Sequence, residues 1–278
     1  MSFKIEYQPK RTHKRYKPVV FDGSHRITKC HVSKALKYFE NSFMNKYGLS
    51  KYGKVDEPFI KFGMYYSEDY RTVLYSQSPV IVVWCGNDAA KKSLKVRARR
   101  LLAHKKRIKH IATSECIAKD LRNVGLECEV IPVTPSEISF EPCKRGDKIY
   151  FYYCSEVKKD FYGYDIAKEV EKRTGIKIIY ATADSFSSEQ MKDVYSKCFM
   201  GLRLTPRDGV ASTVIELGMM GRRSVFNGDS PSSLKWNTVD DVCRIVQEEY
   251  ENRNDNDEED VSRAVKEYLN DNKKWLMI

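Results

Sequence analysis

The chain has 278 residues, and its 49 Lys and Arg against 38 Asp and Glu give a formal net charge of +11 and a pI of about 9.1. A hydrophobic fraction of 41% is enough for a core, and the length allows one large domain or two of ordinary size. No run of about 18 apolar residues is present and the basic start lacks the apolar stretch of a signal peptide, so we expect a soluble cytoplasmic protein, in the host cytoplasm if the chain is viral.

Along the first half of the chain, apolar β-branched runs alternate with helical patterns. We expect helices near residues 32–46, within the basic stretch 89–110, and over 114–125. The run PVIVVWCG is almost continuously apolar, which is typical of a buried parallel strand. The strands expected in this half are 17–23, 57–65, 79–86, 108–114 and 127–133.

The second half repeats the alternation after residues 133–147, a linker that carries Pro, Ser and Gly without periodicity. In the acidic tail we expect a last helix with Asp260 as its N-cap and Arg263 three residues beyond it. The strands expected here are 147–154, 176–182, 199–205 and 223–227, and the other helices are 162–173, 188–197 and 211–221.

Strand–helix alternation twice over predicts an α/β chain of two Rossmann-like, doubly wound domains that face a cleft. The first domain covers residues 1–132, the linker 133–147 and the second domain 148–278, whose last helix is able to pack back on the first domain. Domains of this kind bind ligands at the carboxyl ends of their strands, and paired domains bind them in the cleft between.

Several common sites are missing from the sequence. No Gly-x-Gly-x-x-Gly follows a strand and no P-loop motif is present, which counts against a simple nicotinamide dehydrogenase and a P-loop NTPase. The eight cysteines form no Cys-x-x-Cys pair and the five histidines are scattered, so we expect reduced thiols and no metal site.

The excess of positive charge lies in the first half. Residues 1–132 hold 27 Lys and Arg and 12 Asp and Glu, a balance of +15, whereas residues 133–278 hold 22 and 26, a balance of −4. Residues 89–110 alone carry ten Lys and Arg and no acid. Because surface helices normally mix both signs, we expect an anionic partner here, with a solvated helix face as the alternative.

Within this basic stretch, Leu94, Ala98, Leu101 and Leu102 recur at helical spacing and form a narrow apolar stripe. Positive residues near the start of the chain extend the expected electropositive area. The residues expected to contact the anionic partner are His25, Arg26, Lys91, Lys92, Lys95, Arg97, Arg99, Arg100, Lys105, Lys106 and Arg107.

A second constellation lies in GLRLTPRDGVASTVIELGMMGRRSVFNG, residues 201–228. After a strand comes a loop with Asp208 and Gly209, and a helix begins near Ser212. Glycine permits a close approach of the backbone to a ligand, and the N–H groups of a helix N-terminus suit a diphosphate. Glu216 is placed to accept hydrogen bonds from vicinal hydroxyls. The alternative is a turn aspartate and a surface glutamate.

This stretch resembles the Glu-x7-Glu signature of retaining glycosyltransferases with the GT-B fold, here as Asp208-x7-Glu216 followed by LGMMGRRSVFNG. Further segments match in the same order. VIVVWCGNDAA looks like the family's strand and Gly-x-Asp segment, and ATSECIAKDLRNVGLECEVIPV looks like the end of its first domain. The resemblance covers roughly residues 79–228. Within the family, the chain resembles the DNA glycosyltransferases of bacteriophages.

The chain departs from the family pattern in its first domain and in its signature. Asp208 replaces the first glutamate, which shortens the reach to the sugar but keeps the charge. Trp84 and Cys85 stand where the family commonly has a histidine before Gly-x-Asp, so this segment offers no histidine to contact the sugar.

A further departure concerns the basic pair that follows the first strand of the family's second domain. Here Tyr162 stands directly before the glycine of that segment. The resemblance therefore implies that Lys158, Lys159 or Arg203 supplies the charge for the phosphates. Arg203 is the better candidate, because an arginine on an apolar strand is rarely buried without an anion.

The resemblance implies a retaining hexosyltransferase whose donor is a nucleoside-diphosphate sugar, with UDP-glucose as our prediction and no metal or other cofactor. Helix N–H groups and basic side chains would stabilise the leaving diphosphate. The catalytic residues it implies are Asp208, Glu216 and Arg203. The donor-binding residues it implies are Gly209, Ser212, Thr213, Glu216, Lys158 and Lys159.

In GT-B enzymes the first domain usually holds the acceptor, so its charge predicts an anionic acceptor. We favour DNA with a hydroxymethylated base, because residues 89–110 contain three Leu and no aromatic, a thin apolar face for a membrane helix. The alternatives are a peripheral-membrane glycosyltransferase acting on a lipid or glycan, a non-catalytic nucleic-acid-binding protein, and a GT-B sugar-nucleotide epimerase. A monomer is the default expectation.

Overall fold

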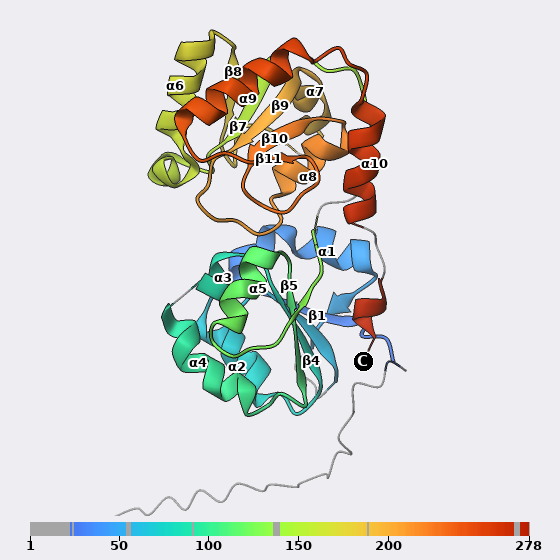
Figure 1. Ribbon diagram of the computed structural model, residues 1–278. Helices are drawn as coiled ribbons and strands as arrows, with labels where there is room; N and C mark the ends of the chain where they lie inside the picture. Colours follow the sequence, from blue (N-terminus) through green and yellow to red (C-terminus); the bar gives the residue numbers. More distant parts are fainter. Residues whose placement is uncertain are drawn as a thin grey trace, which may run out of the picture.

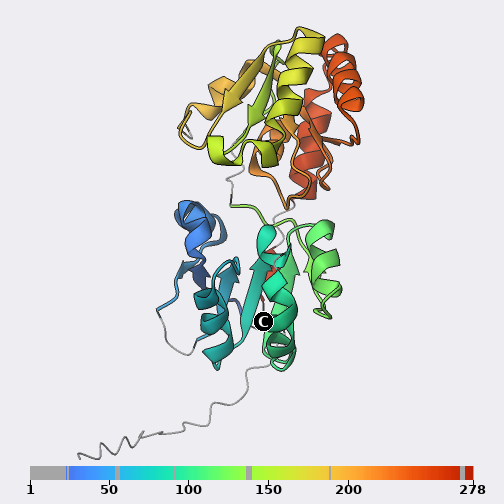
Figure 2. The same ribbon diagram turned by 90° about the vertical axis from the view of Figure 1, so that its left-hand side faces the viewer.

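The computed structural model describes residues 23, 25–53, 57–90, 92–135, 140–187, 189–269 and 273–277. These residues form two parallel sheets, each covered by helices on both faces and stacked one above the other (Figures 1 and 2). The strand expected at 17–23 lies almost entirely outside the described residues. No helix of the described residues is long and apolar enough to cross a membrane.

The first sheet has the strand order β2-β1-β3-β4-β5-β6, with every pair parallel. Parallel strands need crossover connections, and helices supply them here. The strands are β1 (Lys29–Val32), β2 (Ser50–Lys51), β3 (Phe59–Phe62), β4 (Val80–Trp84), β5 (Ile108–Ala112) and β6 (Glu129–Val130). The helices are η1 (Lys34–Phe39), α1 (Glu40–Tyr47), α2 (Ser67–Tyr75), α3 (Asn87–Ala90), α4 (Lys92–Leu102) and α5 (Glu115–Arg122).

The central strand β4 explains why this sheet has two cores. All five of its side chains are buried. Val80, Val82 and Trp84 pack on one face with α2, α4 and α5, whereas Ile81 and Val83 pack on the other face with α1. The almost continuous apolar run predicted a strand buried on both sides, and that prediction is confirmed.

The second sheet has the order β11-β10-β9-β7-β8, again with every pair parallel. Its strands are β7 (Lys148–Tyr152), β8 (Ile178–Ala181), β9 (Cys198–Arg203), β10 (Arg223–Phe226) and β11 (Ser233–Leu234). Its helices are η2 (Glu156–Lys158), η3 (Asp160–Tyr162), α6 (Tyr164–Thr174), α7 (Met191–Ser196), α8 (Ser212–Met219), α9 (Val239–Glu251) and α10 (Glu258–Tyr268).

The end of the chain returns to the first domain as the short helix η4 (Lys273–Leu276). Trp275 and Leu276 are buried in the core that contains α1, and the Trp275 ring meets Tyr47 edge-on at 5.3 Å between centroids. The Ile27 N–H also donates to the Leu276 carbonyl at 2.9 Å. The two domains are therefore joined twice, by the linker and by this returning segment.

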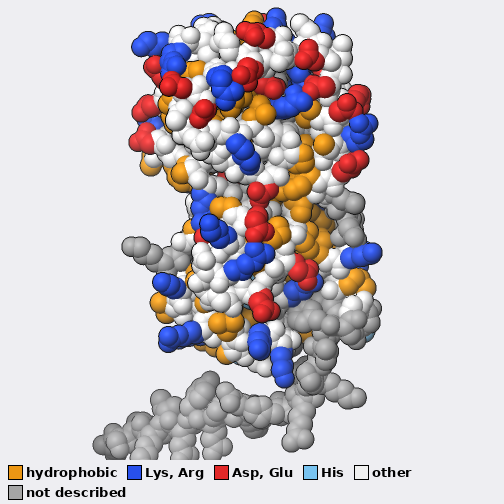
Figure 3. All heavy atoms as spheres, in the orientation of Figure 1, with side chains coloured by type: hydrophobic (Ala, Val, Ile, Leu, Met, Phe, Trp, Pro, Cys, Tyr) orange, Lys and Arg blue, Asp and Glu red, His pale blue; other side chains and the backbone are white. Residues whose placement is uncertain are grey.

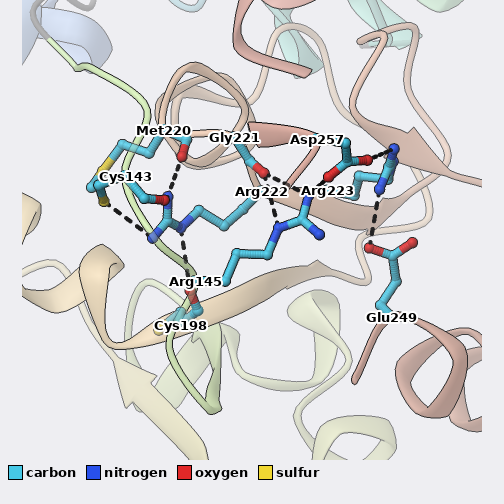
Figure 4. A network of polar contacts seen from close by, with 9 residues as sticks. All are labelled: Cys143, Arg145, Cys198, Met220, Gly221, Arg222, Arg223, Glu249 and Asp257. Carbon is cyan, nitrogen blue, oxygen red and sulfur yellow. Dashed lines mark hydrogen bonds and ion pairs between the residues drawn. The ribbon is translucent and has the colours of Figure 1, made fainter. Parts of the chain in front are cut away.

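A buried network of arginines ties the linker to the second domain (Figure 4). Arg222 is fully buried and donates to the carbonyls of Cys143 (2.8 Å), Lys144 (2.7 Å) and Cys198 (3.2 Å), which satisfies its guanidinium without a carboxylate. Arg145 donates to Gly221 and pairs with Asp257, just before α10.

The observed elements differ from the expected ones at three places. The basic helix ends at Leu102 instead of continuing, because residues 103–107 form turns before β5. Helix α10 begins at Glu258, so Asp260 is not its N-cap but an internal residue that pairs with Arg263 on the helix surface. Helices α2 and α9 were not predicted at all.

Candidate functional site

The carboxyl ends of both sheets face each other where the domains meet. After β9, the loop 204–211 reaches the first domain, where a Cβ added to Gly209 would lie 2.4 Å from the Cys85 carbonyl oxygen and 3.1 Å from Thr113 Oγ1. Cys85 follows β4 and Thr113 follows β5. Because the site residues of doubly wound domains lie at these strand ends, the facing edges are the candidate site.

Arg203 and Asp208 form an ion pair at the end of β9. Arg203 Nε donates to Asp208 Oδ2 at 2.8 Å, and a second guanidinium nitrogen donates to the same oxygen. The guanidinium also lies over the Tyr162 ring at 4.7 Å and near the Tyr152 ring at 5.7 Å. Burial works to lower the pKa of Arg203, but the Asp208 carboxylate and Tyr162 outweigh it, so the cation is firmly charged.

Tyr162, the residue directly before the glycine of the segment that departs from the family pattern, packs against Arg203. It supports the guanidinium that arrives from β9, so a positive charge stands at this edge although the loop after β7 lacks the basic pair. Lys158 is exposed in that loop, while Lys159 lies 3.5 Å from Glu156 and over the Tyr164 ring. Among the described residues, neither lysine forms an ion pair with Asp208.

Glu216 lies one turn into α8, and a buried side chain fixes the position of its carboxylate. The buried Tyr195 hydroxyl donates to Glu216 Oε2 at 2.8 Å. Burial raises the pKa of Tyr195, and the Glu216 carboxylate adds to the rise, so the phenol keeps its proton and remains a donor. The structure therefore fixes the orientation of a carboxylate that the sequence could only place on a helix.

The start of α8 is less open than the sequence suggested. Ala211, its N-cap, is buried, whereas Ser212 and Thr213 are half-buried. A cavity of about 10 Å³ lies beside it and is lined by Gly209, Val210, Ala211, Val214, Ile215, Phe226, Asp229, Ser230 and Tyr268. A space of that size holds one water molecule. The close approach that Gly209 permits is made to the first domain, at Cys85 and Thr113.

Two further contacts hold the domains together on the same side. Arg207, in the loop after β9, pairs with Asp120 of α5. The Glu115 N–H at the start of α5 donates to Asp229 Oδ2 at 2.8 Å. Helix α5 is thus one of the parts of the first domain that the second domain contacts.

Two residues of the first domain's edge were missed as site residues. Asp88 is fully buried and accepts N–H donors from Gly86 (2.8 Å), Met64 (3.0 Å) and Ala89 (3.1 Å), so it fixes the loops after β3 and β4. Burial raises the pKa of Tyr65, and Asp88, Cys85 and Asp208 add to the rise. The Gly-x-Asp segment was the signal for Asp88, and no pattern marked Tyr65.

The predicted nucleic-acid contacts do not form one surface. Arg26 donates to the Tyr47 carbonyl at 2.7 Å, on the sheet face that carries α1, whereas α4 packs on the opposite face. His25 is exposed next to Arg26, and the more N-terminal cations lie outside the described residues. The electropositive area expected to run from the start of the chain to the basic helix is therefore divided by the sheet.

Within the basic stretch, some cations hold the fold and others face solvent. Arg107 donates to the carbonyls of Val73 and Ser78, both at 3.1 Å, and burial lowers its pKa. Lys91 and the side chain of Lys92 lie outside the described residues. The exposed cations are Lys95, Arg99, Arg100, Lys105 and Lys106, and Arg97 is half-buried.

Helix α4 also runs away from the facing edges. It follows the carboxyl end of β4 and returns the chain to the amino end of the parallel strand β5, so its last turns lie at the far end of the first domain (Figure 1). Lys and Arg side chains lie at the lower left of the first domain, where Figure 1 shows α4 (Figure 3). The last turns of the basic helix thus lie at the opposite end of the first domain from the facing edges.

No protein-family model and no curated protein matches this sequence. Solved structures do match by shape. A TarM structure superposes with a TM-score of 0.56 at 13% identity, covering 79% of this chain and 53% of TarM. A variant of TarM from S. aureus in complex with fondaparinux, α-GlcNAc-glycerol and UDP gives a TM-score of 0.57 at 12% identity, covering 80% of this chain and 55% of the other.

Sucrose-phosphate synthase from Thermosynechococcus elongatus gives a TM-score of 0.51 at 10% identity, covering 84% of this chain and 72% of the synthase. The chain spans just over half the length of the two TarM structures. At these identities the likeness is one of fold. With two parallel sheets and neighbours of this kind, the chain has the GT-B fold of two Rossmann-like domains.

Proposed function

We propose that the chain is a glycosyltransferase that moves a sugar from a nucleoside-diphosphate donor to an acceptor held by the first domain. The main observation is the Arg203–Asp208 pair at the edge of the second sheet that faces the first domain, together with Glu216 one turn into the helix that follows this loop. The fold neighbours are GT-B-type glycosyltransferases, and one of them is solved with UDP. Both facts support a nucleotide-sugar donor.

In this proposal the Arg203 guanidinium stabilises the charge that develops on the leaving diphosphate. Asp208 neutralises that guanidinium in the structure. When the donor binds, its phosphates must therefore displace the Asp208 carboxylate from Arg203. The freed carboxylate would then accept hydrogen bonds from the sugar hydroxyls. Glu216, oriented by Tyr195, would accept hydrogen bonds from the ribose hydroxyls.

The proposal is tested with labelled UDP-, GDP- and ADP-sugars, using thermal shift for binding and sugar release or transfer for chemistry. We expect one nucleotide to raise the melting temperature and Glu216→Gln to weaken its binding. Arg203→Gln should reduce turnover about 100- to 1,000-fold, the usual effect of removing one group that stabilises transition-state charge. A matched control is Arg173→Gln, on the exposed end of α6.

Tyr195→Phe refines the test, because it removes the hydroxyl that orients Glu216 and keeps the carboxylate. It should weaken donor binding less than Glu216→Gln does. If no sugar nucleotide shifts the melting temperature and the Arg203 and Glu216 variants behave like the wild type, the transferase proposal is wrong.

For the acceptor, we propose an anionic molecule, with a hydroxymethylated DNA base as the first candidate and a lipid or glycan as the second. The charge of the first domain supports an anion. The position of α4, away from the facing edges, means that its cations would hold the acceptor at a distance from the transferred sugar. Incubation of the labelled donor with plain DNA, hydroxymethylated DNA and a lipid extract separates the candidates by which one becomes labelled.

A further inference from the structure

A groove between α2 and α4 lies on the outer face of the first domain. Its volume is about 540 Å³, and its lining residues are Ser67, Tyr70, Arg71, Leu74, Tyr75, Arg97, Arg100, Ala103 and His104. Three arginines and a histidine thus line one groove, and no carboxylate is among the lining residues. This groove is separate from the site at the facing edges, because α4 leads away from them.

One of these arginines is positioned in advance. Arg97 donates to Ser67 Oγ at 3.1 Å across the groove, and its guanidinium lies 4.2 Å from the centre of the Tyr70 ring. A guanidinium stacked on an aromatic ring keeps donors available at its edge for an anion. The groove therefore offers a fixed cation at its floor.

The remaining cations are exposed and lack acidic partners. Arg71 and Arg100 are exposed, and neither forms an ion pair with another of the described residues. Lys105 and Lys106 continue the positive charge past the end of α4. Since surface charges are normally balanced by neighbours of the opposite sign, this concentration of cations produces a field that attracts a polyanion.

The groove also presents an aromatic ring to solvent. Tyr75 lines the groove with 77% of its surface exposed. Most of the apolar stripe of α4 is not available to a bilayer, because Leu94, Ala98 and Leu101 are buried in the core and only Leu102 of the stripe is exposed. Cations beside an exposed aromatic ring suit a ligand that carries both phosphates and planar bases, as a nucleic-acid strand does.

We propose that the α2–α4 groove binds a single-stranded nucleic acid, with Arg71, Arg97 and Arg100 contacting phosphates and Tyr75 stacking on a base. A duplex keeps its bases stacked inside and cannot offer one to Tyr75, whereas a single strand can. The proposal goes beyond the transferase function, since it requires neither the donor nor the facing edges.

The test measures binding of the full chain to a labelled single-stranded DNA of roughly a dozen nucleotides, a length within the range of single-strand sites, by fluorescence anisotropy. Arg71→Gln with Arg100→Gln removes two exposed cations without touching the core. The matched control is Lys172→Gln with Lys192→Gln, two exposed cations of the second domain. For the ring, Tyr75→Ser is compared with Tyr38→Ser, whose side chain is 82% exposed outside the groove.

We expect the wild type to bind, and the arginine variant to bind at least tenfold more weakly. The slope of log affinity against log salt should become less steep by about 1.4, which is 0.7 for each phosphate of a single strand that the variant no longer neutralises. Tyr75→Ser should weaken binding about tenfold, within the range for the loss of one base stack. Both control variants should bind like the wild type.

Three results would overturn the proposal. One is an arginine variant that binds the single strand as well as the wild type does. Another is equal binding of duplex and single-stranded DNA that Tyr75→Ser leaves unchanged. The third is no binding of the single-stranded DNA by the wild type, and groove-dependent binding of anionic vesicles or of a sulfated glycan would then identify another anion as the ligand. Because no sugar nucleotide is present, each result is independent of whether the chain is a transferase.

Discussion

Lys61 and Asp69 show how single residues stabilise the first domain near its carboxyl edge. Both side chains are buried, and the Lys61 ammonium lies 2.6 Å from Asp69 Oδ1. Ser33 Oγ and the Tyr66 N–H donate to the other carboxylate oxygen at 2.7 and 2.8 Å. Burial works to raise the pKa of Asp69, but Lys61 and these donors outweigh it and hold the pKa below its usual value.

Asp69→Asn should lower the free energy of unfolding by about 3–5 kcal/mol, because it leaves the Lys61 ammonium buried without its carboxylate. Adding Lys61→Met should recover part of the loss. Urea unfolding at pH 7 measures both. Glu115→Gln, in an exposed pair with Arg122, is the control and should cost less than about 1 kcal/mol. Equal costs for the buried and exposed pairs would contradict this account.

His110 gives the first domain a pH dependence. It is buried and its Nδ1 lies 3.2 Å from Trp84 Nε1, which donates to it, and burial lowers its pKa to about 4. Between pH 6.5 and 4 the unfolded chain binds a proton that the folded chain does not, so stability falls as the pH falls. The loss should reach about 3 kcal/mol, at 1.36 kcal/mol for each pKa unit.

The check compares urea unfolding of the wild type and His110→Gln at several pH values from 7 to about 4.5, within the window set by the shifted pKa. The glutamine keeps an acceptor for Trp84 but does not titrate, so its stability should fall less across this range. His25→Gln, an exposed histidine, is the control. Parallel curves for the wild type and His110→Gln would show that another group causes the dependence.

At the scale of elements, burial decided which parts of the fold could be predicted. Strand β4 is apolar along its whole length and β9 is apolar up to Arg203 at its end, so the sequence marked both strands and the two parallel sheets. Helices α2 and α9 were missed although both bury apolar residues at helical spacing, such as Val242, Ile245 and Val246 of α9. The Arg203–Asp208 pair depends on the path of the loop after β9, which residue types alone do not specify.

The sequence of helix α9 carries a signal for the start of a helix. Thr238 Oγ1 accepts from the Asp241 N–H at 3.1 Å, and the Asp241 carboxylate accepts from the Thr238 N–H at 2.9 Å, which is a capping box. Thr238→Ala should cost about 1 kcal/mol of unfolding free energy and Thr238→Ser almost nothing. Urea unfolding distinguishes them, and an alanine variant as stable as the serine variant would mean that the cap contributes nothing.

At the scale of the molecule, the function depends on how the two domains meet. The linker, the returning helix η4 and the contacts of α5 all bring the facing edges together. Hydrophobic side chains gather at the waist between the domains (Figure 3). None of these contacts is local in sequence. The sequence predicted two domains, a linker and a last helix able to pack back on the first domain, but it did not predict the contacts of α5.

Gly209→Ala tests this contact, because the new Cβ would lie 2.4 Å from the Cys85 carbonyl oxygen, and a backbone atom of the other domain cannot move aside alone. We expect the domains to separate at this point, with a larger radius of gyration in X-ray scattering and a loss of about 1–3 kcal/mol in unfolding. Gly86→Ala is the control in the same region, since its Cβ would meet only the Tyr65 hydroxyl at 3.7 Å, an ordinary contact. Identical scattering for both variants and the wild type would mean that the domains do not rest on each other at Gly209 in solution.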